Sequence, residues 1–387
     1  MIGWLIIPLA ALAPFVAPAA TPPARAAAEQ RVRAALDGYA HLAGRAYGES
    51  LREAETLKSA IAQMLAHPSQ RSLGRAREAW IACRDAYGRT ETFRFSGGPI
   101  DDRHPVTGID GPETRINSWP IDEAFLDYVA GSPRSGIIGD LSSPLTEALL
   151  VRRNTAEDET QVTLGYHAIE FLLWGQDRRR DGPGQRPFSD YLPGHPVRER
   201  RRRCLSLIAD RLVRDLATVK VEWDAGPRRY VDHFRALDPK DALGHALSGP
   251  ATLAAFELAS ERIGVALSSG SQEDEQSCFS DNTHRDLASN IEGIAQVLEG
   301  DAGTPGLMLA VEAIDPALAE DARERLRRAR ELVYAVPPPF DAILLAPEDD
   351  PRRRTLQALA GELLGLAGDL QRAGAAFGAR VVIGGGG

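Results

Sequence analysis

The sequence of 387 residues predicts an all-α protein of bundle-like architecture. Two observations predict this fold class. Apolar residues recur at intervals of three and four over long stretches, as on one face of a helix, and runs of alternating β-branched residues are nearly absent. With 43% apolar and 26% charged residues, the chain is long enough to form more than one folded domain.

The periodic stretches predict helices in order along the chain. Residues 27–66 contain no proline and predict one long helix. A second helix is predicted over 72–95, where a Ser-Gly-Gly-Pro segment follows. A loop rich in Asp, Gly and Pro follows as far as Trp119. Asn154 precedes three acidic residues, a pattern typical of a helix N-terminus, and predicts a helix that ends at Trp174. Further helices are predicted over residues 196–222, 250–268, 283–299, 316–335 and 352–378.

The first residues have the features of a secretory signal. They are apolar but too short, and too interrupted by Pro8 and Pro14, to predict a membrane span. Ala17-Pro18-Ala19 and Ala24-Arg25-Ala26 both fit an Ala-x-Ala cleavage pattern, which predicts a signal peptide over 1–26 and export of the chain. No later stretch reaches about 18 apolar residues, so we expect no integral membrane segment in the mature chain.

Segments rich in Gly and Pro between residues 222 and 250 divide the remaining helices into two groups. We therefore expect an N-terminal bundle over 27–235, a C-terminal bundle over 236–383 and a flexible tail over 384–387.

Charge and cysteine content exclude several classes of protein. The chain has 45 basic and 54 acidic residues, a net charge of -9, which does not favour binding to nucleic acid. The arginine clusters at 178–180 and 200–203 are typical of solvated helix faces. Three cysteines allow at most one disulfide within the chain, and none of their spacings predicts a thiolate metal site.

The clearest candidate for chemistry is a polar pair in an apolar helix. His167 and Glu170 are three residues apart and share a face of the helix predicted to end at Trp174. A carboxylate in such surroundings is costly unless a metal, an arginine or several donors meet it. One interpretation is a buried pair bonded to itself and to the backbone. The other is metal ligation, since imidazole with carboxylate suits zinc, iron or copper.

A second polar stripe lies on the helix predicted over 72–95. Trp80, Arg84, Tyr87 and Glu91 are spaced so that they share one face. Arg84 and Glu91 are either a structural ion pair, or a carboxylate ligand with an anion clamp beside it. Asp101 follows at the end of this helix and is expected near whatever the stripe faces.

A third polar segment covers residues 272–286. Part of it is explained by a helix N-cap at 281–283, and its acidic density also suits a hard cation such as calcium, although the spacing of an EF-hand is absent. Glu257 and Glu261, on the preceding helix with Arg262 beside them, are predicted to be a surface or inter-helix charge set. The His-Glu-x-x-His, Gly-x-Ser-x-Gly, P-loop and dinucleotide-binding motifs are absent, which leaves the common hydrolase and nucleotide chemistries without support.

At these residues the chain resembles the imelysin-like family, in its branch called iron-regulated protein A. Residues 165–170 match the family's Gly-x-His-x-x-Glu motif. Three further blocks carry the resemblance, at residues 90–101, 116–123 and 272–286. The chain departs from the pattern at Gln276, where histidine is expected, and at Thr92, where alanine is usual.

The resemblance implies two four-helix-bundle-like domains with a polar site near their interface, and export to the bacterial periplasm or outer-membrane region. It also implies a role in iron uptake, with an envelope iron-transport partner for the cargo. Some family members carry a metallopeptidase label.

These observations lead to a first hypothesis and two alternatives. The first is a periplasmic protein of iron acquisition that binds iron, with zinc as the second choice, or a metal-bearing small ligand. Its expected metal ligands are His167, Glu170, Glu91 and Asp101. The residues expected to orient them or balance their charge are Arg84, Trp80, Tyr87, Arg94 and Asp281. The alternatives are a zinc-dependent peptidase of the imelysin type and a non-catalytic interaction protein of the cell envelope.

Overall fold

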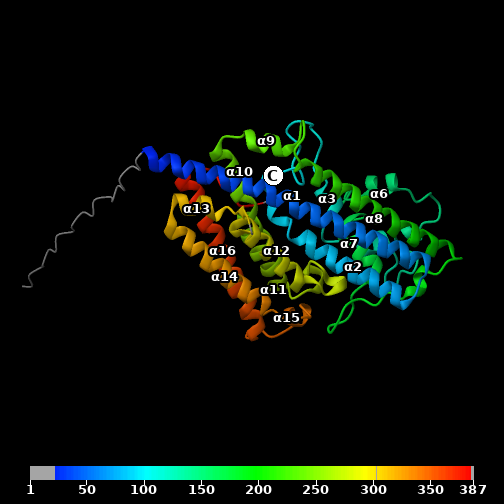
Figure 1. The fold of residues 1–387 in the computed structure, drawn as a ribbon. Coiled ribbons are helices and arrows are strands. Elements are labelled where there is room, and N and C mark those ends of the chain that lie inside the picture. The colour runs from blue at the N-terminus through cyan, green and yellow to red at the C-terminus, as the bar shows by residue number, and fades with distance from the viewer. Residues whose placement is uncertain (1–21, 302, 385–387) are drawn as a thin grey trace, which may run out of the picture.

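The protein is all-α, as the sequence predicts (Figure 1). The computed structural model describes residues 22–301 and 303–384. Most of the predicted signal peptide and of the tail therefore lies outside the described residues, and both stay predictions. In the described part of the chain no helix combines the length and the apolar character that a membrane crossing requires.

The longest helices are α1 (Pro22–Ala66), α2 (Gln70–Gly88), α8 (Pro196–Glu222), α12 (Thr283–Glu299), α14 (Pro316–Tyr334) and α16 (Pro351–Phe377). Shorter α-helices are α3 (Glu113–Ile116), α4 (Glu123–Leu126), α5 (Gly136–Gly139), α6 (Glu147–Arg153), α7 (Gly165–Trp174), α9 (Tyr230–Ala236), α10 (Pro239–Thr252), α11 (Ala266–Ser269), α13 (Met308–Ile314) and α15 (Asp341–Leu344). The 3-10 turns are η1 (Glu91–Phe93), η2 (Phe188–Tyr191), η4 (Gln272–Asp274) and η5 (Cys278–Ser280), and η3 (Leu253–Val265) is a π-helix. A two-stranded antiparallel hairpin pairs β1 (Gly300–Asp301) with β2 (Thr304–Pro305).

Four helices form a closed group around the polar motif. Helices α2 and α8 each pack against both α1 and α7, so the short α7 is enclosed. Every residue of α7 is buried, which explains why its sequence is apolar on nearly all sides. These helices lie mostly within residues 27–235, the range for which an N-terminal bundle is predicted.

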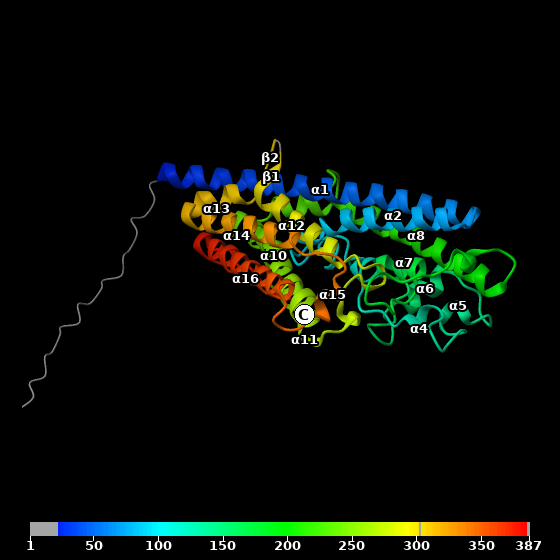
Figure 2. The same cartoon turned by 90° about the horizontal axis from the view of Figure 1, so that it is seen from below.

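A second group contains α10, η3, α12, α14 and α16, and α16 packs against α10, η3 and α14. Helix α1 runs along both groups, as Figure 2 shows, and α12 packs against α2 of the first group and α14 of the second. The buried apolar residues of both groups form one continuous cluster. The division at residue 235 into two domains stays a prediction.

Close approach of α12 to α2 depends on glycine. A Cβ atom added at Gly293 would lie 2.5 Å from the carbonyl oxygen of Arg89, and one at Gly88 would lie 2.9 Å from Ser289 Cβ. Only a residue without a side chain fits at Gly293. This contact brings the polar residues of α12 against the end of α2.

Three predicted helices differ from those observed. The helix predicted from residue 154 is wrong over its first half, since α7 begins only at Gly165. Asn154 follows the end of α6, and its side-chain oxygen accepts hydrogen bonds from the backbone N–H groups of Thr163 and Leu164, at 2.9 and 3.1 Å. The same amide that can cap a helix therefore organises a loop here.

The helix predicted over 72–95 ends early, at Gly88, and continues as the 3-10 turn η1. The helix predicted over 250–268 is the later part of a helical run from 239 to 269, whose middle is the π-helix η3. The other predicted helices agree with α1, α8, α12, α14 and α16 to within about five residues at each end.

Candidate functional site

Helix α7 carries the polar pair into the centre of the first helix group. His167 Nδ1 and Glu170 Oε2 are 2.8 Å apart, and both side chains are 0% exposed. The predicted one-turn spacing therefore produces a direct hydrogen bond between imidazole and carboxyl group.

The first glycine of the motif fixes where α7 begins. Gly165 has a φ of +85°, a conformation that other residues rarely adopt. A Cβ atom at this position would also lie 2.4 Å from the carbonyl oxygen of Ile116. The segment that contains Ile116 and Trp119 can therefore pass directly against the N-terminus of α7.

Glu170 is held on its other oxygen by Ser280, the last residue of η5. Its Oε1 accepts hydrogen bonds from the Ser280 backbone N–H at 3.0 Å and from Ser280 Oγ at 2.6 Å. Burial raises the pKa of Glu170 well above its usual value, while the Ser280 donors and the nearby Arg84 act in the opposite direction. Burial likewise lowers the pKa of His167 well below its usual value, helped by Arg84 and Arg262. The imidazole is therefore neutral at pH 7.

The second ring nitrogen of His167 is unused. Its Nε2 is buried and has no hydrogen-bond partner among the described residues. The ring of Trp119 packs on the imidazole with 4.7 Å between ring centroids, and Trp119 is itself half-buried. With Nδ1 committed to Glu170, Nε2 is the atom that the site leaves for a ligand.

Arg84 of α2 is the positive centre beside the pair. It is 0% exposed and donates through Nε to Asp286 Oδ1 at 3.2 Å, and through Nη1 to the side-chain oxygen of Asn117. Asp286 also accepts hydrogen bonds from Ser277 Oγ and, at 3.1 Å, from Asn282 Nδ2. The arginine predicted as a clamp is thus the hub of a buried network that joins α2, α12 and the loop before Trp119.

Glu91, a predicted ligand, is already paired with an arginine. Its carboxylate accepts hydrogen bonds from both terminal nitrogens of Arg262, the shorter at 2.5 Å, and from Asn290 Nδ2 at 3.1 Å. Although burial opposes ionisation, Arg262 and Arg84 lower the pKa of Glu91 to about 2. Glu91 is therefore ionised at neutral pH, 4.0 Å from Arg84.

Asp101, the fourth predicted ligand, binds Arg94. Arg94 Nε donates to Asp101 Oδ1 at 2.9 Å, and the Phe95 backbone N–H donates to Asp101 Oδ2 at 3.0 Å. Arg94 also forms an ion pair with Glu113 at 3.2 Å. Asp101 lines a second cleft of about 620 Å³ with His245 and Arg380, and Arg94 joins it to Glu91, whose carboxylate lies 3.8 Å from the same guanidinium.

The two aromatic residues of the predicted stripe pack around the first turn of α7. Trp80 Nε1 donates to the backbone oxygen of Tyr166 at 3.0 Å. The rings of Tyr87 and Tyr166 lie 4.8 Å apart, and Arg84 lies over both tyrosine rings. These residues fix α2 against α7.

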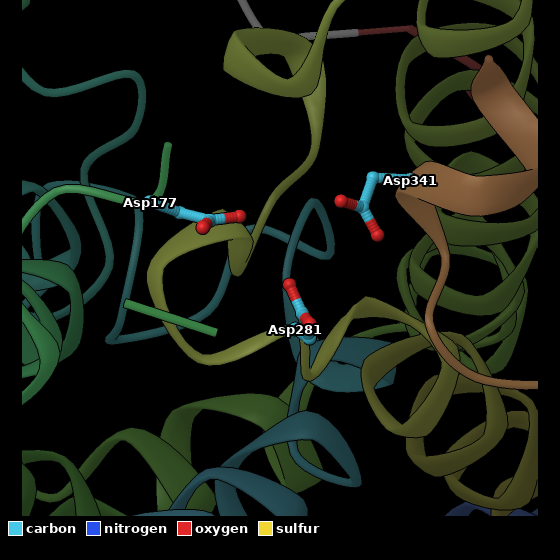
Figure 3. A group of neighbouring side chains, drawn as sticks. All are labelled: Asp177, Asp281 and Asp341. Carbon is cyan, nitrogen blue, oxygen red and sulfur yellow. The ribbon is translucent and has the colours of Figure 1, made fainter. Parts of the chain in front are cut away.

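Asp281 follows Ser280 in the chain, and no hydrogen bond or ion pair links its side chain to Glu170 among the described residues. Its carboxylate is close to those of Asp177 and Asp341 instead, and all three have oxygen atoms within 4.8 Å of one another (Figure 3). The role of Asp281 in orienting the metal ligands stays a prediction.

A cleft of about 790 Å³ opens beside the buried network. Trp119, Asn117 and Arg262 form part of its wall, so it reaches the groups that contact His167, Arg84 and Glu91. The π-helix η3 contributes Phe256, Glu257 and Glu261 to the wall, together with Arg262. Eight carboxylates and two arginines line the cleft, which makes it strongly acidic. The carboxylates belong to Glu113, Glu157, Asp158, Glu159, Glu257, Glu261, Glu273 and Asp274.

Sequence reasoning missed the partners that come from distant segments. Arg262 was expected to belong to a surface or inter-helix charge set; it is part of an inter-helix set, but its buried partner Glu91, 171 residues away, was not predicted. Asp286, Ser280 and Asn117 lie in blocks that carry the family resemblance, but no spacing assigns them a role. The signal that could have found Arg262 is its place next to two glutamates on an otherwise apolar helix.

Fold and site together define an all-α protein with a buried histidine–carboxylate pair beside an acidic cleft. The chain belongs to the imelysin family, of the peptidase M75 type, whose model matches residues 43–370. The family resemblance seen in the sequence is thereby confirmed.

Relatives agree with this assignment. Iron-regulated protein A of Synechococcus elongatus is 24% identical over 307 residues, covering 76% of this chain and 72% of that protein. The crystal structure of a protein described as an iron-regulated protein A precursor, from Parabacteroides distasonis ATCC 8503, superposes with a TM-score of 0.68 at 19% identity, covering 89% of this chain and 95% of that one. An imelysin-like protein from Psychrobacter arcticum 273-4 gives a TM-score of 0.62 at 15% identity, covering 92% and 98%. The two structures show the shared fold.

Proposed function

We propose that this protein binds a metal ion, iron in the first place, or an iron-bearing small ligand, through His167, whose ring packs against Trp119 of the acidic cleft. The observation that carries the proposal is the unpartnered, fully buried Nε2 atom of a neutral imidazole. A neutral imidazole nitrogen is a common ligand of transition metals, and a buried nitrogen without a partner is costly unless something binds it.

Glu170 supports His167 as an orienting group in this proposal. A histidine that binds a metal through one ring nitrogen usually donates the other N–H to a carboxylate or carbonyl, which fixes the ring and its tautomer. The contact of 2.8 Å between His167 and Glu170 has this arrangement, and Ser280 holds the carboxylate in turn. Direct ligation by Glu170 stays a prediction, and would require the carboxylate to exchange one of these hydrogen bonds for the metal.

The remaining ligands come from the cleft or from the bound molecule itself. Acidic walls concentrate cations, and carboxylate oxygens such as those of Glu257 and Glu261 suit iron once it is inside. Ligation by Glu91 or Asp101 stays a prediction, because each would have to leave an arginine partner. Arg262 and Arg84 balance the charge of Glu91 beneath the cleft.

Binding is favoured over hydrolysis. A hydrolytic zinc ion needs about three protein ligands and an open water position. Around His167, the described carboxylates of Glu170 and Glu91 are already bonded to other side chains, which leaves one free ring nitrogen. A non-catalytic envelope protein would not need this nitrogen to be free.

Export to the periplasm, and delivery of the cargo to an envelope iron-transport partner, complete the proposal. It is supported by the family, by the relative from Parabacteroides distasonis that is described as a precursor, and by the sequence pattern over residues 1–26. No nucleic acid enters this proposal, in keeping with the net charge of -9.

The test is metal binding by the purified mature protein and by His167→Ala, with His41→Ala as the control because His41 is exposed on α1. Anaerobic titration with Fe²⁺, and with Zn²⁺ in parallel, should show one site that is lost in His167→Ala and kept in His41→Ala. Cu²⁺ is added to the wild-type protein as a second probe, because this measurement does not depend on the folding of a variant that lacks a buried side chain. Electron paramagnetic resonance should then show coupling to one imidazole nitrogen. Unchanged stoichiometry in a folded His167→Ala, or no nitrogen coupling, would overturn the proposal.

A further inference from the structure

Three aspartates from separate parts of the chain meet outside the histidine site. Asp177 follows α7, Asp281 lies between η5 and α12, and Asp341 opens α15. One carboxylate oxygen of each lies within 4.8 Å of the others, and the three side chains converge in Figure 3. Nothing in the sequence spacing predicts this group, because Asp177 and Asp341 are far apart in the chain.

Two of the three aspartates are buried, and three of their carboxylate oxygens lack a hydrogen-bond partner. Asp281 is only 7% exposed, and neither of its carboxylate oxygens has a hydrogen-bond partner. Asp341 is 0% exposed, and its Oδ1 atom also has no partner. In the described residues 22–301 and 303–384, no side-chain nitrogen of a lysine, arginine or histidine forms an ion pair within 4.0 Å with any of the three carboxylates, and the guanidinium of the neighbouring Arg179 is paired with Asp181 instead.

One amide holds two of the carboxylates at a fixed separation. Gln272 Nε2 donates to Asp177 Oδ2 at 3.0 Å and to Asp341 Oδ2 at 2.7 Å, and it also contacts the backbone oxygen of Arg179 at 2.6 Å. The Asp177 Oδ1 atom accepts a hydrogen bond from the Arg179 backbone N–H at 3.0 Å. Asp281 has no such support, and its backbone adopts a left-handed φ of +54° that aims the residue at the other two.

The electrostatic cost of this arrangement is large. Burial, with repulsion from Asp341 and Asp177, raises the pKa of Asp281 to about 7, and burial raises that of Asp177 to about 6. Arg179 offsets part of this repulsion, but its guanidinium is bonded to Asp181 at 3.0 and 3.2 Å. Buried charges of one sign persist in proteins when they are paired or bind a metal.

We propose that Asp177, Asp281 and Asp341 bind a hard divalent cation, calcium in the first place, at a site separate from His167. Three carboxylates and nearby backbone oxygens are the ligands that calcium, magnesium and manganese prefer. The upper limit of 4.8 Å on the oxygen separations fits calcium. Its bonds of about 2.3–2.6 Å let ligand atoms up to about 5 Å apart share one ion, whereas magnesium, at about 2.0–2.1 Å, limits them to about 4.2 Å.

The cation would join three segments that otherwise repel one another. One bound ion would contact the loop after α7, the residue before α12 and the start of α15. It would thereby link the helix that carries the motif to the last third of the chain. This role is structural, and it does not require a ligand on His167.

The experiment compares calcium binding by the full protein and by Asp281→Asn, a substitution that keeps size and tolerates the left-handed backbone. Asp349→Asn is the matched control, since Asp349 is exposed on the α15–α16 loop. Protein stripped with chelating resin should bind one Ca²⁺ by calorimetry and should melt at a higher temperature as Ca²⁺ is added. Asp281→Asn should weaken binding by about 10-fold or more, because affinity follows the number of charged ligands. Asp349→Asn should bind as the wild type does.

Two further results decide the assignment. Without Ca²⁺, Asp281→Asn should be at least as stable as stripped wild-type protein, because it removes the repulsion between Asp281 and the other two aspartates. Weaker Ca²⁺ binding by this variant would then not result from unfolding. His167→Ala, where folded, should keep Ca²⁺ binding, which separates this site from the proposed iron site. No Ca²⁺-dependent rise in Tm, equal affinity in Asp281→Asn and Asp349→Asn, or tighter binding of Mg²⁺ than of Ca²⁺ would overturn the proposal.

Discussion

Ser280 and Asp281 are consecutive residues that face two different groups of acidic side chains. Ser280 donates hydrogen bonds to Glu170 through its backbone N–H and its hydroxyl group, at 3.0 and 2.6 Å. Asp281 turns its unpartnered carboxylate toward Asp177 and Asp341. A single peptide bond therefore connects Ser280, which holds Glu170, to Asp281, which belongs to the aspartate group.

This connection predicts coupling between the two proposed sites. A calcium ion that fixes Asp281 also fixes Ser280 against Glu170, so less ordering is needed when a metal binds His167. We expect saturating Ca²⁺ to tighten Fe²⁺ binding by about 5-fold, measured by anaerobic titration in metal-free buffer, and bound Fe²⁺ to tighten Ca²⁺ binding by the same factor. In Asp281→Asn the effect should vanish. Equal Fe²⁺ affinities with and without Ca²⁺ would show that the sites are independent.

Glu91 predicts a defined dependence of stability on pH. Its pKa is lowered from 4.5 to about 2, so its contribution to the free energy of unfolding is present above about pH 4.5 and is lost as the pH falls toward 2. The shift corresponds to roughly 3 kcal/mol. Urea unfolding of wild type and Glu91→Gln should therefore differ by about this amount at pH 7, and the difference should shrink steadily below pH 4.5.

The control for this measurement is Glu261→Gln, since Glu261 is exposed on η3. Its difference from wild type should be within about 0.5 kcal/mol at every pH. A Glu91→Gln difference that stays constant between pH 3 and pH 7 would show that the ion pair with Arg262 does not set the stability of the carboxylate.

Trp119 is predicted to control access to His167. The indole packs on the imidazole and lines the cleft, while His167 itself is 0% exposed, so we expect a metal from the cleft to reach Nε2 when this side chain moves. Trp119→Ala should increase the association rate of Fe²⁺ several-fold in stopped-flow measurements, and Trp119→Phe, which keeps a ring, should stay near the wild-type rate. Identical rates in all three proteins would mean that the ion arrives by another route.

The fold was largely predictable from the sequence because its signals are local. The apolar periodicity that predicts a helix lies within the helix's own sequence, as in α1, α8, α12, α14 and α16. The predicted ends of these helices agree closely with the observed ends. The helix predicted from Asn154 was wrong because a side-chain amide that can cap a helix can equally accept hydrogen bonds from the backbone of a loop. Here it bonds the backbone of Thr163, nine residues later, which the local sequence does not reveal.

The candidate site was predictable in part, for a different reason. The His167–Glu170 contact follows from one helical turn, so spacing alone indicated it. The partner of Glu91 lies on η3 and that of Arg84 on α12, and neither helix is placed by local pattern. The aspartate group is the extreme case, since three isolated residues meet only after the whole chain has packed.

Gly165 offers the sharpest test of how the motif is built, because the chain contains a matched control. Gly165 and Gly131 both have a φ of +85°, but a Cβ atom at Gly165 would lie 2.4 Å from the backbone oxygen of Ile116, whereas one at Gly131 would meet nothing within 4 Å. Gly131→Ala should thus report backbone strain alone, a loss of about 1–2 kcal/mol. Gly165→Ala should lose that amount and roughly 1–3 kcal/mol more, because the segment before Trp119 must shift away from α7. Denaturant unfolding of the two variants measures the difference, and equal losses would show that the glycine of the motif is kept only for its backbone conformation.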